Sequence, residues 1–261
     1  MIPKGQLHGF VGGAPNGYWA LSVQFEMSGI YDAPDKPLVN FLAEDATDTE
    51  KLLSAEALME KNEALGKAFE QNPIFPVMFE LDNASDETKR KFLSYFQILS
   101  DHFQRMMLLR SAVCDHPGMN SVFWEHLDDE FGHHEDLKKA RGSSTVSWDP
   151  IYDATNVWFT HQMMTCDDRE RLFLVNYVVE ESASIFYQKI AKVFAGMGIG
   201  HFDDHAEWDE AHNALGKNYF DQVDYYSLDR LARLQERGWS MVECQYRRLA
   251  EIAQMCMKAS K

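Results

Sequence analysis

The sequence predicts an all-α protein, with a single helical domain of about seven helices over residues 46–261 behind an irregular N-terminal segment, residues 1–45. From Ala46 onward, apolar residues recur at spacings of three and four, as on the buried face of a helix. Capping residues and Gly or Pro signals mark where these stretches begin and end. No internal repeat, low-complexity linker or block of like charge divides the chain.

The segment 1–45 carries turn signals in place of helical periodicity. The stretch 12–17 is rich in glycine, and 33–37 contains two prolines. Residues 18–25 are expected to form a short strand. The glycines do not make a phosphate-binding loop, because no Gly-Lys-Ser/Thr follows them and no strand–helix unit surrounds them.

The first three helices are expected over residues 48–71, 85–114 and 117–142. Pro73 and Pro76 are expected to end the first helix, since proline interrupts a helix interior. Ser85 is a good N-cap for the second helix, and Gly142 occupies the C-cap position of the third.

Four more helices are expected over 154–164, 167–194, 202–220 and 227–258, of which the first is minor. Asp167 with Glu170 three residues later resembles a capping box that opens the long helix 167–194. Gly238 is expected to be a weak point inside the last helix.

Composition and charge exclude several classes of function. No window reaches the ~18–20 uninterrupted apolar residues of a membrane span, and no signal-peptide pattern opens the chain. The formal net charge of −16, without a basic stripe, argues against nucleic acid as a partner. The four cysteines are far apart and form no CxxC pair, which fits reduced thiols in a cytoplasmic protein.

The most specific local pattern is a stripe of two imidazoles and a carboxylate, His205, Asp209 and His212. At roughly 100° per residue the three side chains project from one face of a helix. Unpaired polar groups on a buried face cost free energy, whereas imidazole with carboxylate suits iron, manganese or zinc. The stripe therefore predicts a metal site, and a solvated helix face is the alternative.

Two further places supply side chains of the same kinds. Glu130 and His133 repeat the carboxylate-x-x-His spacing of Asp209 and His212, and helical dimetal proteins use two such units. Glu180 and Glu181 interrupt the apolar middle of helix 167–194, although either could face water. His126 and His201 lie one or two turns from these positions and are candidates for groups that support the ligands.

These motifs resemble the heme-oxygenase-like diiron oxidases and oxygenases, also described as iron-containing redox enzymes. The stretch 202–212 is similar to that family's His-x3-Asp-x2-His helix, and 125–134 to its helix with a glutamate followed by a histidine. Residues 72–75, which lead into the second expected helix, resemble the early region of that family. The similarity covers about residues 72–216, and implies a heme-oxygenase-like bundle for 46–261.

The resemblance implies two Fe(II) ions per chain, with O2 as co-substrate. The implied metal ligands are Glu130, one of two adjacent histidines, His133 or His134, Glu180 or its neighbour Glu181, and the three residues of the stripe, His205, Asp209 and His212. Between the alternatives, His133 and Glu180 are preferred. An additional carboxylate from an earlier helix stays unassigned.

The implied activity is oxidative cleavage, decarboxylation or N-oxygenation of a small organic substrate, amino-acid-derived or amphiphilic, through a peroxo-diiron intermediate. An external electron donor and a homodimer stay open. The alternatives are a cofactorless oxidase or a thiaminase-like enzyme on the same fold, a heme oxygenase, and a non-enzymatic carrier of a metal or ligand. A ferritin-like four-helix bundle is the structural alternative.

Overall fold

The computed structural model describes residues 8–10, 20–22, 54–194, 197, 217–220 and 223–259. The chain divides into two compact units, residues 1–52 and 53–261. In the first unit, strands β1 (His8–Phe10) and β2 (Ala20–Ser22) pair antiparallel, with His8 opposite Ser22. Strand β2 lies inside the strand expected over 18–25.

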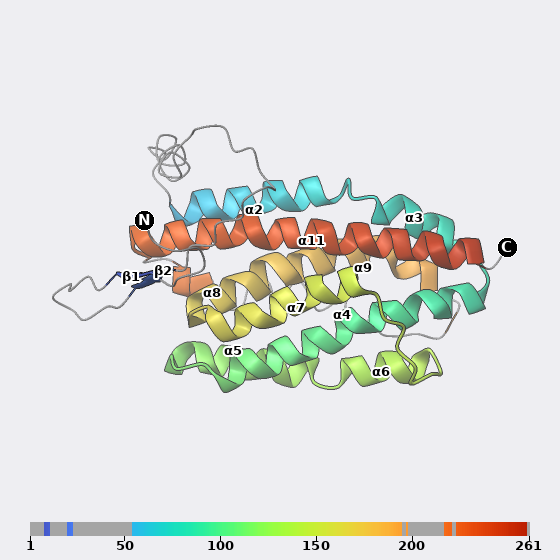
Figure 1. Ribbon diagram of the computed structural model, residues 1–261, viewed down its shortest axis with the longest axis horizontal. Helices are drawn as coiled ribbons and strands as arrows, with labels where there is room; N and C mark the ends of the chain where they lie inside the picture. Colours follow the sequence, from blue (N-terminus) through green and yellow to red (C-terminus); the bar gives the residue numbers. More distant parts are fainter. Residues whose placement is uncertain are drawn as a thin grey trace. The chain divides into compact units, whose positions relative to one another are not determined.

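The described part of the second unit is helical, which confirms the prediction of an all-α bundle (Figure 1). Its elements are α2 (Ala55–Phe69), α3 (Ile74–Asp82), α4 (Asp86–Ala112), α5 (Pro117–Glu130), α6 (His133–Ala140), α7 (Pro150–Thr165), α8 (Asp168–Phe173), the π-helical segment η2 (Leu174–Val179), α9 (Glu180–Phe194), the 3-10 turn η4 (Lys217–Phe220) and α11 (Tyr225–Ala259). No helix among the described residues is long and apolar enough to cross a membrane. Of the helix expected over 202–220, only η4 lies within the described residues.

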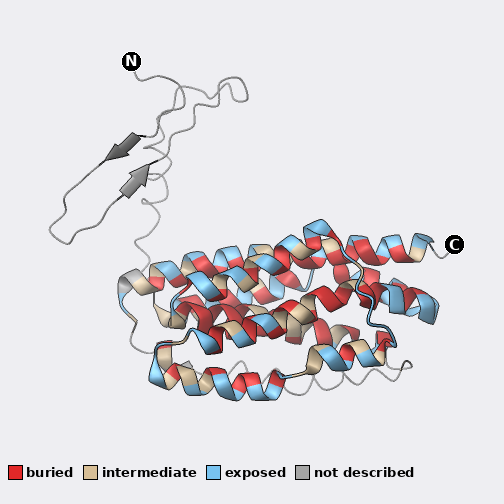
Figure 2. Ribbon diagram, turned by 60° about the horizontal axis from the view of Figure 1, so that its bottom comes forward, coloured by how far each residue is buried: buried red, intermediate tan, exposed pale blue. Residues whose placement is uncertain are grey.

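Helix α11 is the element around which the bundle packs. It contacts α2, α3, α4, α7, α8 and η2, and Figure 1 shows it running alongside α2 and α3. The buried stripes of the helices face one another (Figure 2). Aromatic side chains from three helices meet there, since the Phe186 ring stacks on Phe96 and lies 4.9 Å from the Tyr246 ring, centroid to centroid.

Several predicted helix starts are confirmed by their caps. The Ser85 hydroxyl accepts a hydrogen bond from the Thr88 amide, and Asp167 and Glu170 form the reciprocal capping box. All four cysteines are free, and Cys166 and Cys256 are buried.

One expectation about the helices is confirmed and another was wrong. The helix before Pro73 and Pro76 ends at Phe69, as expected, and the two prolines open α3, a helix that was not expected from the sequence, with Pro73 as the N-cap and Pro76 in the first turn. Proline is tolerated there because amides of the first turn have no partner within the helix. The single helix expected over 117–142 is two helices, because Gly132 adopts a φ of 99° between α5 and α6.

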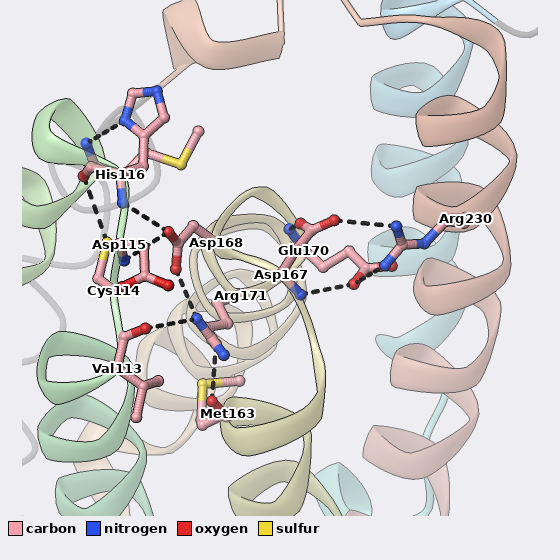
Figure 3. A network of polar contacts seen from close by, with 11 residues as sticks. Val113, Cys114, Asp115, His116, Met163, Asp167, Asp168, Glu170, Arg171 and Arg230 are labelled. Carbon is pink, nitrogen blue, oxygen red and sulfur yellow. Dashed lines mark hydrogen bonds and ion pairs between the residues drawn. The ribbon is translucent and has the colours of Figure 1, made fainter. Parts of the chain in front are cut away.

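A polar network fixes the start of α8, the helix that leads toward η2 (Figure 3). The Asp168 carboxylate accepts hydrogen bonds from the Asp115 and His116 amides, at 3.0 and 2.9 Å, and from Arg171 at 2.6 Å. Arg230 of α11 donates to Glu170 at 2.7 Å. The α4–α5 junction, α8 and α11 are thereby held together at one end of the bundle.

The segment η2 is wider than an α-helix, and its neighbours are adapted to it. The Asn62 side chain of α2 donates to the Tyr177 carbonyl oxygen, while Gln235 and Trp239 of α11 donate to Asn62 Oδ1 at 3.1 and 2.8 Å. On α11, a Cβ atom at Gly238 would lie 2.9 Å from Leu174 Cδ1 and 3.1 Å from Val178 Cγ1. The expectation of a weak point at Gly238 was therefore wrong, because α11 runs unbroken and the glycine allows it to approach η2 closely.

Replacing Gly238 by valine should lower the free energy of unfolding by about 2 kcal/mol, because the added side chain overpacks the contact with η2. Urea denaturation followed by far-UV circular dichroism measures this. Ser240→Val, at an exposed position of the same helix, is the control and should change it by less than about 0.5 kcal/mol. Equal losses in the two variants would contradict the close contact.

Asp149 joins the start of α7 to α11. Its carboxylate accepts from the Ile151 and Tyr152 amides and, at 3.0 and 2.7 Å, from Nε and Nη2 of Arg248. The hydrogen bonds from Arg248 are the main cause that lowers the pKa of Asp149 below its usual value. The native state therefore gains stability from this carboxylate above the usual aspartate pKa, and loses it as the pH falls through the lowered value.

Asp149→Asn should accordingly lower the free energy of unfolding at pH 7 by about 2 kcal/mol, since a buried charged hydrogen-bond network is broken. The deficit should shrink below about pH 4, because Asp149 of the unfolded chain takes up a proton there and the native carboxylate follows at its lowered pKa. Urea denaturation at several pH values tests this, with the exposed Asp136→Asn as control. A deficit that is constant down to pH 2 would disprove the role of the charge.

Candidate functional site

The candidate site surrounds a cavity of about 50 Å³ in the helical unit. Its walls come mainly from α4, α7, α9 and α11, with the α5–α6 junction at one side. Much of the wall is apolar or aromatic, including Phe103, Met106, Phe159, Tyr187 and Tyr246. The predicted ligand candidates that reach this cavity are Glu130, His133, His134 and Glu180.

Glu130 and His133 form one pair of groups at the cavity. The Glu130 side chain is buried, and its Oε2 lies 3.0 Å from Nδ1 of His133. The prediction that both residues belong to one helix was wrong, because α5 ends at Glu130 and α6 begins at His133. The chain reversal at Gly132 nevertheless keeps the two side chains in contact.

Glu180 forms a second pair with His126. Glu180 is the first residue of α9 and is 2% exposed. Its Oε1 lies 2.9 Å from Nε2 of the fully buried His126. His126 was named as a candidate to support a ligand, and this role stays a prediction. His201, the other histidine named for that role, lies outside the described residues.

Arg110 of α4 extends this pair into a buried chain of polar groups. Its Nη2 donates to Nδ1 of His126 at 2.6 Å and its Nη1 donates to the Asn176 side-chain oxygen at 2.9 Å. Since a guanidinium only donates, Nδ1 of His126 must accept. The ring of His126 is therefore neutral, with its proton on Nε2, facing Glu180.

The charge of Arg110 acts on both carboxylates of the site. Complete burial lowers the pKa of Arg110 to about 10, and this effect is opposed by Glu180 first and Glu130 second. The guanidinium is thus charged at neutral pH and compensates part of the negative charge that Glu130 and Glu180 bring into the interior. The guanidinium carbon also lies 4.8 Å from the centre of the Phe123 ring.

The two glutamates of the pair 180–181 point in different directions. Glu180 lines the cavity, whereas the Glu181 side chain lies toward Gly66 of α2, where its Oε1 would be 3.4 Å from a Cβ atom added to that glycine. Burial, with a smaller contribution from Glu63, raises the pKa of Glu181. This geometry favours Glu180 over Glu181 as a ligand.

His134 also lines the cavity, so the choice between His133 and His134 stays open. Nε2 of His134 lies 3.3 Å from Oε1 of Glu135, and its Nδ1 is buried with no hydrogen-bond partner within residues 54–194 and the other described stretches. Both imidazole side chains line the cavity.

The stripe of His205, Asp209 and His212 lies outside the described residues. Among the residues that are described, no three His, Cys, Asp or Glu side chains are grouped closely enough to hold a metal ion. The described residues thus supply one part of the predicted ligand set, and the stripe remains a prediction.

Sequence reasoning missed Arg110, Asn176 and Gln104. Arg110 follows the apolar run Met106-Met107-Leu108-Leu109. A charged residue at the end of such a run is a signal for a buried cation that compensates buried carboxylates. Asn176 interrupts the apolar run before Glu180 in the same way. Gln104 carries no signal of this kind.

The fold and the site define the protein as an all-α bundle with a buried carboxylate–imidazole site at an apolar cavity. No family model matches the chain. It is 36% identical over 192 residues to the uncharacterized protein RP592 of Rickettsia prowazekii (strain Madrid E). The aligned region covers 73% of this chain and 92% of that protein. The chain belongs to the same family as RP592.

The described residues fit a divalent metal in the chemistry of their donors. Two carboxylates, each 3% exposed or less, lie at one cavity with imidazoles beside them, and this donor set suits iron, manganese or zinc. His126 lies beside Glu180, where a group that supports a metal ligand would lie.

Arg110→Met should lower the free energy of unfolding by about 3–5 kcal/mol, because His126 and Asn176 lose this donor and both carboxylates lose the neighbouring charge. Urea denaturation of the full chain measures the loss. Arg90→Met, at an exposed position of the same helix, should change stability by less than about 0.5 kcal/mol. A small effect of Arg110→Met would mean that the interior does not depend on this guanidinium.

Proposed function

We propose that the protein is an O2-activating non-heme diiron oxidase or oxygenase that acts on a small organic substrate. The observation that carries the proposal is the convergence of Glu130 and Glu180, from different helices and each with an imidazole partner, on one apolar cavity. The resemblance of the 202–212 stretch to the heme-oxygenase-like diiron enzymes supports the same function.

In this proposal Glu130, His133 or His134, and Glu180 hold iron together with the predicted ligands His205, Asp209 and His212. When bound there, ferrous iron would supply electrons for the reduction of O2. Oxidative cleavage, decarboxylation and N-oxygenation are the proposed outcomes, and an external electron donor completes those that need more electrons.

The residues of the chain orient the ligands and exclude water. Arg110 donates to Nδ1 of His126, so the proton of this ring is on Nε2. That nitrogen lies beside the Glu180 carboxylate and helps to orient it. Phe103, Phe159 and Tyr187 surround the site with apolar surface, which keeps bulk water from a reactive centre. We further propose a cytoplasmic location, since the four free cysteines suit a reducing compartment, and leave a homodimer open.

Glu180→Ala should abolish stoichiometric iron binding and O2 consumption, because a ligand that projects into the cavity is lost. The protein is reconstituted with Fe(II) without oxygen, desalted and analysed for metal, and O2 uptake is then recorded with an oxygen electrode. Wild type should hold two irons per chain. His205→Ala should lose iron in the same way if the stripe belongs to the site.

The matched control is Glu181→Ala, the next residue of α9, whose side chain faces α2 and should be dispensable for iron. Loss of iron in Glu181→Ala but not in Glu180→Ala would refute the assignment of the ligand. Wild-type protein that binds no iron would favour a cofactorless enzyme. Reversible iron binding without O2 consumption would favour a carrier.

A further inference from the structure

The side chain of Gln104 on α4 has a fixed orientation. Its Oε1 accepts a hydrogen bond from the Gly132 amide at 2.8 Å, at the junction between α5 and α6. Because a backbone N–H only donates, the oxygen of the Gln104 amide must face Gly132, and the Nε2 group must point elsewhere. Gln104 is 5% exposed and lines the cavity.

The Nε2 group of Gln104 is a buried donor with no hydrogen-bond partner in the described part of the chain. Leaving such a donor without an acceptor costs about 1–3 kcal/mol. Gln97, two turns earlier on the same helix, shows the contrast. Its Nε2 donates to Asp101 Oδ1 at 2.9 Å and to the His134 carbonyl at 2.8 Å, and its Oε1 accepts from Arg141.

The surroundings of this donor restrict what it can bind. Leu99, Phe103 and Met106 of α4 line the same cavity, as do Glu130 and Glu180, and no Lys or Arg is among its described lining residues. A neutral donor in a mostly apolar cavity that already holds two carboxyl groups suits a neutral acceptor better than a free carboxylate, whose charge would be desolvated. Another glutamine at the cavity, Gln245, already donates to Asn156 Oδ1 at 2.7 Å.

We infer that the cavity is a binding site for a small, mostly apolar molecule whose carbonyl or hydroxyl oxygen accepts a hydrogen bond from Nε2 of Gln104. The inference names the substrate class of the proposed enzyme. Its description of the ligand as a substrate rests on the proposed function, whereas the binding itself does not need iron. Gln104 is thus a residue that determines specificity, and it also holds the junction between Glu130 and His133.

The test compares acetone with isobutene, two molecules of similar shape in which a carbonyl oxygen replaces a CH2 group. Full-length protein labelled with ¹⁵N-glutamine is titrated with each, and the side-chain amide signals are followed by NMR. Acetone should shift the Gln104 Nε2–H signals of the wild-type protein, and isobutene at equal occupancy should leave them nearly unchanged. The signals are assigned by through-bond correlation in the wild type.

The variant Gln104→Met removes the donor at nearly constant size. The ratio of the isobutene dissociation constant to that of acetone should fall about tenfold or more in this variant, as expected for the loss of one buried hydrogen bond. Gln97→Met is the matched control, because Gln97 also fastens α6 to α4 but does not line the cavity. Its ratio should equal that of the wild type.

Equal shifts of the Gln104 signals by the two molecules, or a ratio that is unchanged in Gln104→Met, would overturn the inference. The wild-type titration decides the matter even if Gln104→Met does not fold. Iron-free and iron-loaded protein are compared so that the two proposals fail separately. Acetone selectivity without iron binding would reject only the diiron function, and iron binding without selectivity would reject only the role of Gln104.

Discussion

The rest of the site depends on the burial of two carboxylates inside an apolar bundle. A carboxylate in such surroundings is stable only with compensating charge and hydrogen bonds. Arg110 provides part of both, since it donates to His126 and Asn176 while its charge acts on Glu180 and Glu130. The guanidinium on α4 thereby links α5, η2 and α9. A shift of any one of these elements would break a contact that the buried charges need.

The two departures from regular α-helix in this part of the chain lie next to those carboxylates. The chain leaves α5 directly after Glu130, and η2 ends directly before Glu180. Local widening of a helix costs backbone hydrogen bonds, so it persists only where neighbours replace them. Asn62 does this for the Tyr177 carbonyl, and Gln104 does it for the Gly132 amide. The irregular backbone is therefore built into the packing of α2, α4 and α11.

Most of the helical framework could be predicted from the sequence because its signals are local. The caps at Ser85 and Asp167 and the acidic interruption at Glu180 need only neighbouring residues to be recognised. What failed depends mostly on distant partners, since Gly238 is required by the closeness of η2 to α11. Helix α3 was missed although its signal is local, because proline is tolerated in a first turn. The burial of Arg110 follows from side chains on other helices. The stripe at 205–212 stays a prediction.

Gln104 shows how one side chain can join the architecture of the site to its selectivity. The amide oxygen has a structural role, because it accepts a hydrogen bond from the Gly132 amide. This bond stabilises the junction between α5 and α6 at which His133 contacts Glu130. That use leaves the amide nitrogen for another acceptor, with no freedom to exchange places with the oxygen. A glutamine without this hydrogen bond could turn its amide group by about 180° and present its oxygen to a donor as readily as its nitrogen to an acceptor. The fixed amide cannot, so the same hydrogen bond that shapes the α5–α6 junction selects for molecules that carry an acceptor oxygen.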